Sequence, residues 1–260
     1  MLRALPGRRN VLRRHLSRVI GPEAPAEQLD ELVRAGFASY ARYWLDSFRL
    51  PASSKAEMDA RMVHDGYERI LEARRAGTGA IMALPHLGGW DFGGAWFAAQ
   101  GHPITVVVER LDPPELFEWF RRLRADMGMN VVAVDENSGP AVLRALKDNH
   151  VVALVSDRDL TGTGPEVDFF GERTTLPGGP AVLALRTGAP ILPVGVYFRP
   201  DGGYHGIVHP PIPVERVGPR LADDVARITQ LLARELEVLI RRAPEQWHLL
   251  QPNWPSDAEL

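Results

Sequence analysis

The sequence predicts an α/β fold: a mixed, largely parallel sheet flanked by helices, with a helical N-terminal cap. After about residue 76, short β-branched runs alternate with helical stretches, the pattern of strands joined by crossover helices. Before that point the apolar residues follow helical spacing only. The 260 residues contain no repeat, low-complexity tract or convincing linker. We therefore expect one domain over 1–260, with a helical part at 1–75 and an α/β core at 76–260.

The N-terminal part is expected to form helices at 9–20, 26–48 and 55–75. The first is amphipathic, because Leu12, Leu16 and Val19 share one stripe and arginines surround it. The core is expected to contain strands at 80–85, 104–108, 131–134, 151–155, 191–197 and 206–214, and helices at 91–99, 114–127, 138–148, 178–187 and 221–242. Three prolines between residues 210 and 213 predict that the last strand lies at a sheet edge, since proline cannot donate to a ladder.

The composition indicates a globular chain and excludes several kinds of site. Hydrophobic residues make up 45% and charged residues 24%, which supports a sizeable core and argues against disorder. No cysteine is present, so disulfides, cysteine-ligated metals and a thiol nucleophile are excluded. The net charge of -3 excludes a generally basic nucleic-acid binder. Neither an apolar run of about 18 residues nor a secretory signal is evident, so we expect a cytoplasmic protein, soluble or peripheral.

Several catalytic motifs are missing. The sequence contains no G-x-S-x-G elbow, no phosphate-binding G-x-x-x-x-G-K-[ST] loop and no H-E-x-x-H zinc motif. His205 and His209 are four residues apart, but their setting among proline and glycine favours an ordinary edge-strand pair over a metal site. These observations disfavour serine hydrolysis, phosphoryl transfer and dinucleotide redox chemistry, and we expect no metal.

The remaining candidate is His86, which follows the strand expected at 80–84 and precedes a helix expected from about Asp91. Polar residues at the carboxyl ends of strands are where α/β proteins usually bind ligands. Gly88 and Gly89 allow the loop to fold back, which would bring the Asp91 carboxylate to the imidazole and make His86 a general base. On spacing alone, a capping aspartate and an ordinary surface histidine explain the pattern better.

Other motifs decide between these explanations. They are His86-x₄-Asp91, Val108-Glu109-Arg110, the segment 120–124 followed by Gly128, Asp157-Arg-Asp159, 167–171, 176–180 and 244–247. In this order and spacing they resemble the glycerolipid acyltransferases, and within them the lipid A lauroyl acyltransferases. The pieces 38–44, 48–51 and 158–161 most closely resemble the actinobacterial phosphatidylinositol mannoside acyltransferases.

This resemblance implies an acyl-CoA-dependent enzyme without a cofactor. It would move a fatty acyl chain, expected to be palmitoyl, to a mannose hydroxyl of a phosphatidylinositol mannoside at the inner face of the plasma membrane. By the same resemblance His86 is the general base, Asp91 orients it, and Glu109 and Arg124 line the acceptor site. Asp157 is a second acid near the histidine, where the mannoside enzymes favour glutamate. Its role relative to Asp159 stays open.

A direct transfer fits the residues present. His86 would accept the hydroxyl proton, which is worth about 10²–10⁴-fold in rate. Backbone N–H groups near Gly88 and Gly89 would stabilise the tetrahedral oxyanion. The acyl chain needs an apolar groove, and the aromatic residues that would line it, unless they are plain core, are Trp90, Phe92, Trp96, Phe97 and Phe117.

The first 20 residues carry six arginines and no acid, namely Arg3, Arg8, Arg9, Arg13, Arg14 and Arg18. Such a helix would bind an anionic membrane surface, at about 1 kcal/mol per arginine. The alternative is an ordinary solvated helix face packed on the domain. Three other functions also stay open: acyl transfer to another glycolipid or a lysophospholipid, a lipid-binding relative that has lost catalysis, and a hydrolase that admits water to His86.

Overall fold

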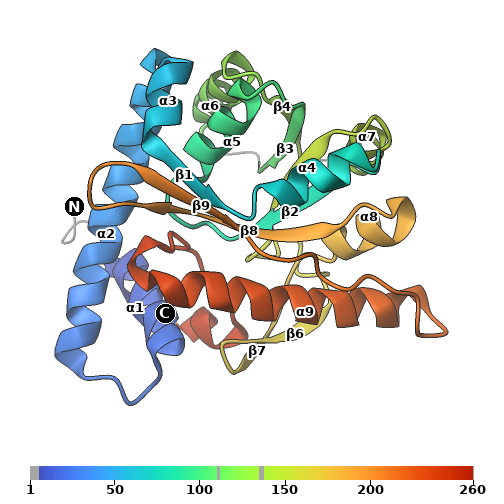
Figure 1. Ribbon diagram of the computed structural model, residues 1–260. Helices are drawn as coiled ribbons and strands as arrows, with labels where there is room; N and C mark the ends of the chain where they lie inside the picture. The colour runs from blue at the N-terminus through green and yellow to red at the C-terminus, as the bar shows by residue number, and fades with distance from the viewer. Residues whose placement is uncertain (1–5, 110–111, 135–137, 260) are drawn as a thin grey trace.

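A computed structural model describes residues 6–109, 112–134 and 138–259 (Figure 1). Within these residues the chain forms a seven-stranded sheet in the order β1-β9-β8-β2-β5-β3-β4, and a separate β6–β7 hairpin. The strands are β1 (Met62–Asp65), β2 (Ala80–Leu84), β3 (Ile104–Val108), β4 (Asn130–Ala133), β5 (Val151–Val155), β6 (Glu166–Phe169), β7 (Glu172–Thr175), β8 (Ile191–Phe198) and β9 (Tyr204–Val208). Neighbouring strands of the sheet are parallel except for β8 and β9, so the predicted α/β class is confirmed.

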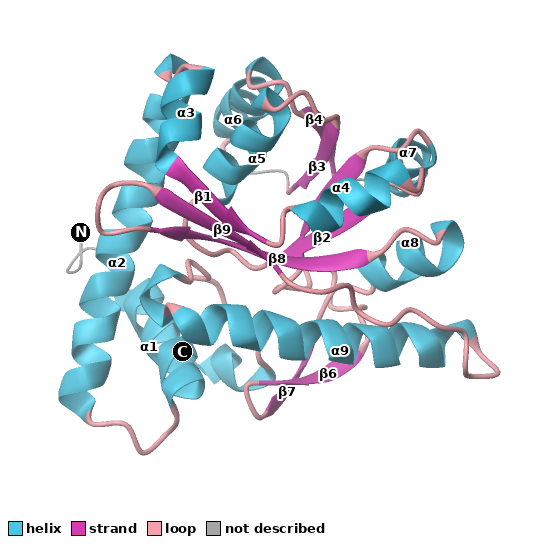
Figure 2. Ribbon diagram, viewed as in Figure 1, coloured by secondary structure: helices cyan, strands magenta, loops and turns pink. Residues whose placement is uncertain are grey.

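Helices cover both faces of this sheet (Figure 2). The helices are α1 (Pro6–Ile20), α2 (Ala26–Arg49), α3 (Lys55–Arg61), α4 (Glu68–Arg75), α5 (Trp90–Ala99), α6 (Pro114–Asp126), α7 (Ser138–Lys147), α8 (Gly179–Thr187) and α9 (Leu221–Arg242), with short 3₁₀ turns at Leu50–Ala52, Pro244–Gln246 and Pro255–Glu259. One core lies between the sheet and α7, α8 and α9. A second lies under α4 and α5 on the opposite face, and a third joins α1 to α2.

The single helix predicted at 55–75 is wrong, because a strand divides it. Ser54 caps α3 through a capping box with Glu57, and the helix ends at Arg61. The next four residues form β1, which pairs in parallel with β9. Gly66 then turns the chain with φ +76°, and a Cβ there would lie 2.2 Å from the Val208 carbonyl oxygen, so the turn requires glycine.

The position predicted for the last strand is also wrong. β9 ends at Val208, before the prolines, and lies between β1 and β8 inside the sheet. The prolines follow the strand and therefore place no restriction on its ladder. The β6–β7 hairpin was not predicted from the sequence. Its two strands have four residues each, and Phe170 and Gly171 at the turn both adopt positive φ.

Candidate active site

His86 lies in the loop that joins β2 to α5, and its side chain is 30% exposed. Two other segments hold this loop. Gly88 N–H donates to the Gln246 carbonyl and Gly89 N–H to the Val196 carbonyl, both at 2.9 Å. The Gly88 and Gly89 N–H groups are therefore already engaged, so an oxyanion near this turn would need other backbone N–H groups. Gly88 has φ +59°, and a Cβ would lie 2.1 Å from the Val196 oxygen, so only glycine fits here.

The carboxylate that contacts His86 belongs to Asp157. β2 and β5 are parallel neighbours whose ends are in register, Leu84 beside Val155, so the residues that follow both strands meet at one edge. His86 Nδ1 lies 2.8 Å from Asp157 Oδ1, and His86 N–H donates to Oδ2 at 3.0 Å. A carboxylate at Nδ1 makes that nitrogen the donor, which leaves Nε2 as the basic nitrogen.

Asp157 is fully buried and surrounded by donors from the C-terminal tail. Trp247 Nε1–H donates to Oδ2 at 2.7 Å, and Asn253 Nδ2–H donates to the Asp157 carbonyl at 3.0 Å. Burial acts to raise the pKa of this carboxyl, but the charge and hydrogen bond of His86 and the Trp247 N–H lower the pKa below its usual value. Asp157 is therefore an ionised partner for the imidazole.

The expected contact between Asp91 and His86 is replaced by a different one. Asp91 lies in the first turn of α5, and Gly89 occupies the N-cap position. The Asp91 carboxylate accepts from Arg124 Nε at 2.8 Å and Nη2 at 3.1 Å, and from Tyr43 Oη at 2.7 Å. It therefore joins α5 to α6 and α2. Burial, followed by the Asp91 charge, raises the pKa of Tyr43 well above its usual value, so this phenol stays protonated.

The two residues expected at the acceptor site lie in different surroundings. Arg124 is largely buried in its pair with Asp91, whereas Glu109 is exposed and accepts from Arg158 at 3.4 Å. Arg110, the last residue of the motif that contains Glu109, lies outside the described residues.

Asp159 has a different role from Asp157. Its carboxylate accepts from Thr161 N–H at 3.0 Å and Gly164 N–H at 2.7 Å, so it organises the loop after β5. Asp157 is the acid of this motif that contacts the histidine.

An apolar pocket of about 830 Å³, counting its open mouth, lies between α5 and the sheet. Its walls include the strand residues Met82, Leu84, Val106, Val108, Ala153, Val155, Val194 and Val196, with Asp91 and Arg124 also in its lining. Of the aromatic residues expected there, Trp90, Trp96 and Phe97 line the pocket. Phe92 instead stacks on Tyr204 with ring centroids 3.6 Å apart, and Phe117 is buried on α6. Trp90 also lies edge-on to the His86 ring, with the ring centroids 5.6 Å apart, so the pocket extends to the site.

Two partners in the site, Tyr43 and Trp247, belong to quoted motifs, 38–44 and 244–247, but neither was expected to have a role there. Trp247 ends the tail motif at 244–247, which marks it as part of the resemblance but not as a partner of Asp157. Tyr43 stacks on Trp90 with centroids 4.2 Å apart, which no local pattern in α2 predicts.

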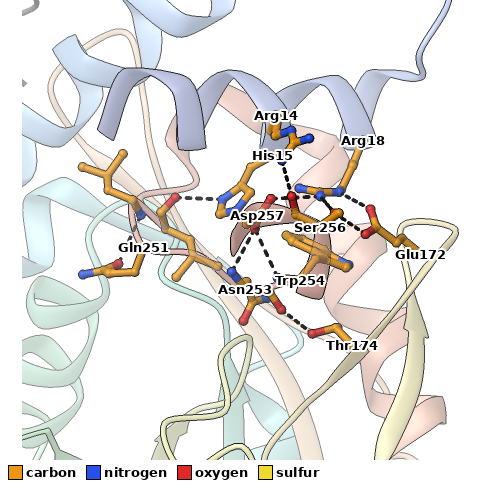
Figure 3. A network of polar contacts seen from close by, with 12 residues as sticks. Arg14, His15, Arg18, Glu172, Thr174, Gln251, Asn253, Trp254, Ser256 and Asp257 are labelled. Atoms are coloured by element: carbon orange, nitrogen blue, oxygen red, sulfur yellow. Dashed lines mark hydrogen bonds and ion pairs between the residues drawn. The ribbon is translucent and has the colours of Figure 1, made fainter. Parts of the chain in front are cut away.

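The arginines of α1 differ in exposure and in their partners. Arg13 binds Asp30, and Arg14 binds the Ser256 carbonyl. Arg18 is 12% exposed and contacts Glu172 at 2.7 Å and Asp257 at 2.9 Å (Figure 3). Arg8 and Arg9 lie on the exposed start of the helix, whereas the sixth arginine, Arg3, is outside the described residues.

The described helices and acidic or histidine side chains also bear on membrane spans and metal sites. Across 6–109, 112–134 and 138–259, every helix is too short or too polar to cross a bilayer. Over the same ranges, no cluster of three or more histidine, aspartate or glutamate side chains is suited to hold a metal ion.

Comparison with known proteins identifies the family of the chain. Residues 1–256 match the family described as bacterial lipid A biosynthesis acyltransferase. The phosphatidylinositol mannoside acyltransferase of Mycolicibacterium smegmatis is 40% identical over 249 residues, which cover 95% of this chain and 79% of the relative. The protein of the same name from Mycobacterium tuberculosis H37Rv is 40% identical over 252 residues, 95% of this chain and 77% of the relative. The lipid A biosynthesis acyltransferase of Haemophilus influenzae is 25% identical over 233 residues, which cover 87% of this chain and 69% of the relative. The resemblance inferred from the motifs is confirmed, and the chain belongs to the bacterial lipid A biosynthesis acyltransferase family.

Proposed function

We propose that this chain transfers a fatty acyl group from acyl-CoA to a mannose hydroxyl of a phosphatidylinositol mannoside, with His86 as general base. One observation carries the proposal: Asp157 engages Nδ1 of a partly exposed His86, beside a pocket with apolar walls. The names of the mycobacterial relatives support the choice of acceptor.

The reaction needs no covalent enzyme intermediate. The sugar hydroxyl gives its proton to Nε2 of His86 while its oxygen attacks the thioester carbon. The tetrahedral intermediate then collapses, the carbon–sulfur bond breaks, and the imidazolium returns the proton to the CoA thiolate. Asp157 stabilises the imidazolium, since its carboxylate is held at Nδ1 throughout.

The pocket suits the acyl chain better than a sugar. Aliphatic side chains of the sheet form one wall and Trp90, Trp96 and Phe97 of α5 another. Gly93 lets α5 lie close to the sheet, because a Cβ there would come within 2.7 Å of Val196 Cγ2. Palmitoyl is the chain that we propose, and its apolar surface favours this environment at about 25 cal/mol per Å² buried.

A lipid acceptor requires the site to work at a membrane, and we propose the cytoplasmic face of the plasma membrane. Arg8 and Arg9 of α1 are exposed and would contact anionic headgroups, although Arg9 also lies 3.6 Å from Asp30. Arg13 and Arg18 are less exposed and bind acids of the protein, so they contribute less than the sequence suggested.

A mass-spectrometric transfer assay tests the proposal. Purified protein is mixed with palmitoyl-CoA and a panel of phosphatidylinositol, its mono- and dimannosides, and lysophospholipids. His86→Ala is assayed alongside His209→Ala, a matched control in which the histidine pairs with Glu235 at 2.7 Å on α9. We expect one mannoside to gain one acyl mass with the wild type and His209→Ala, and no acceptor to gain mass with His86→Ala.

Other outcomes point to the alternatives. Acyl transfer to a lysophospholipid alone would refute the mannoside acceptor and keep the reaction. Free fatty acid with no acylated lipid would indicate a hydrolase. Equal activity of the His86→Ala variant would refute the base, and a wild type that binds lipid without transfer would indicate a non-catalytic relative.

A further inference from the structure

The structure assigns Trp247 a positioning role in the proposed reaction: its indole N–H holds the Asp157 carboxylate toward His86. The inference rests on the proposed function and names a residue that acts on the base through its partner. Trp247 does not touch the reacting atoms. It lies behind Asp157, 161 positions along the chain from His86.

The donors around Asp157 divide the work between its two oxygens. Oδ2 accepts from two neutral donors, Trp247 Nε1–H at 2.7 Å and His86 N–H at 3.0 Å. Oδ1 faces the imidazole Nδ1 at 2.8 Å. Because Oδ2 is fixed at two points, the carboxylate plane cannot rotate, and Oδ1 stays directed at the ring.

Trp247 is itself held rigidly. Its side chain is fully buried. The centroid of its ring lies 5.4 Å from that of His15 and 5.7 Å from that of Phe170. Its backbone forms an antiparallel bridge with Leu87, one residue after the catalytic histidine. The indole therefore has no room for another orientation, and its N–H is presented to Asp157 before substrate arrives.

The electrostatic effect has a definite sign. The positive end of the N–H dipole points at a pair that carries one negative charge when His86 is neutral and none when His86 is protonated. The dipole thus favours the deprotonated pair, which is the active form. Without this donor, the pair takes up its proton at a higher pH, and activity is lost earlier on acidification.

Two other histidines face this group of residues. His248 donates its backbone N–H to the His86 carbonyl at 2.7 Å. Burial first, and then the charge of His86, lower the pKa of His248 to about 3, so its ring stays neutral between pH 5 and 8. His15 of α1 stacks on Trp247 and binds Asp257, and it also lies edge-on to Trp254 at 5.0 Å. Any effect that passes through His15 would therefore appear on changing either tryptophan.

The test compares Trp247→Phe with Trp254→Phe. Trp254 is a matched control, because it is 3% exposed, lies on the same tail and donates its indole N–H to the Phe169 carbonyl at 3.2 Å. Each variant keeps an aromatic ring and loses one hydrogen bond, but only the first loses a donor to Asp157. The kcat/KM of acyl transfer is measured for the wild type and both variants between pH 5 and 8.

We expect Trp247→Phe to lower kcat/KM about tenfold to a hundredfold and to move its acid limb up by about one pH unit. The acid limb of Trp254→Phe should match the wild type. An unmoved limb in Trp247→Phe, or an equal shift in both variants, overturns the inference.

A second readout needs no substrate and separates this inference from the proposed function. Diethyl pyrocarbonate modifies the neutral imidazole, and mass spectrometry of the His86 peptide gives its rate at each pH. That profile should shift upward in Trp247→Phe only, even if the wild type transfers no acyl group to any lipid. Should Trp247→Phe fail to fold, benzothienylalanine at position 247 keeps the size of indole without its N–H, and the same shift is expected; an unshifted profile refutes the role.

Discussion

Two histidine–aspartate pairs in this molecule, each with a buried aspartate, contain the same residue types and have different roles. His86 pairs with Asp157 at 2.8 Å at the sheet edge, and His15 pairs with Asp257 at 3.1 Å between α1 and the C-terminal tail (Figure 3). Both aspartates are at most 1% exposed, and both accept backbone N–H bonds. Each histidine also lies against a tryptophan ring.

The pairs differ at the second ring nitrogen. His15 is fully buried, and its Nδ1 lies 3.0 Å from the Leu249 carbonyl, so an acceptor occupies both sides of the ring. The ring thus ties α1 to the C-terminal tail through both nitrogens, and we call this pair the clamp. His86 is 30% exposed, and among the described residues its ring is hydrogen-bonded through Nδ1 alone, to Asp157. A histidine–aspartate pair is therefore a base or a clamp according to what meets the other nitrogen.

Removing each histidine should separate the two roles most strongly. His86→Ala should reduce acyl transfer by about 10²–10⁴-fold, because it removes the proposed proton acceptor, while the thermal unfolding midpoint changes little. His15→Ala should lower the unfolding midpoint and leave the rate of the folded enzyme within a few fold. Transfer assays and calorimetry at one pH measure both. A His86→Ala variant that keeps a tenth of the activity would contradict the comparison.

The stability of the clamp can be measured through its aspartate. Asp257→Asn removes the charge that Arg18 and His15 face in a buried site, so the free energy of unfolding should fall by about 3–5 kcal/mol. Urea denaturation measures it. Asp30→Asn is the control. Asp30 of α2 is more exposed and pairs with Arg13, which lies on α1 as His15 does, so the substitution should lower the free energy of unfolding by less than about 1 kcal/mol. Equal decreases in the free energy of unfolding for the two variants would show that burial does not strengthen the interactions of Asp257.

Acid should also weaken both pairs, and we expect it to lower the free energy of unfolding by less than the substitutions above. Burial alone would raise the pKa of Asp257, but its hydrogen bonds to His15 and to backbone N–H groups lower it, as the corresponding contacts do for Asp157. A carboxyl with a lowered folded-state pKa stabilises the fold above its unfolded value of about 3.9, and that stability is lost as the pH falls toward the folded value. Unfolding measured from pH 5 down to 2 should show this loss, with a shallower slope in Asp257→Asn. Parallel slopes would contradict it.

The sequence predicted the local parts of this molecule well. Helices with a clear apolar stripe, such as α9, lie where the periodicity placed them, and so does the loop that presents His86. The β1 strand was not predicted, because its four residues lie between two helices and show no clear alternation of apolar and polar residues.

The partners within the site were harder to predict. Asp91 is near His86 in the sequence, and spacing made it the expected partner. The contact goes to Asp157 because the registered ends of β2 and β5 bring distant residues together. The Asp91 side chain faces Arg124 and Tyr43, which come from two other helices. Such pairings depend on strand order, which hydrophobic periodicity does not encode.

The bridge between Leu87 and Trp247 also has a consequence for the order of assembly. The loop that carries His86 is made before the residues that hold Asp157 and the loop itself, Gln246 and Trp247, which lie about 160 positions further along the chain. Contacts of such long sequence separation form late in folding. A nascent chain released before Trp247 would contain the histidine and much of the sheet, but the base would lack its support. Competence of the site thus requires the chain to have been made through Trp247.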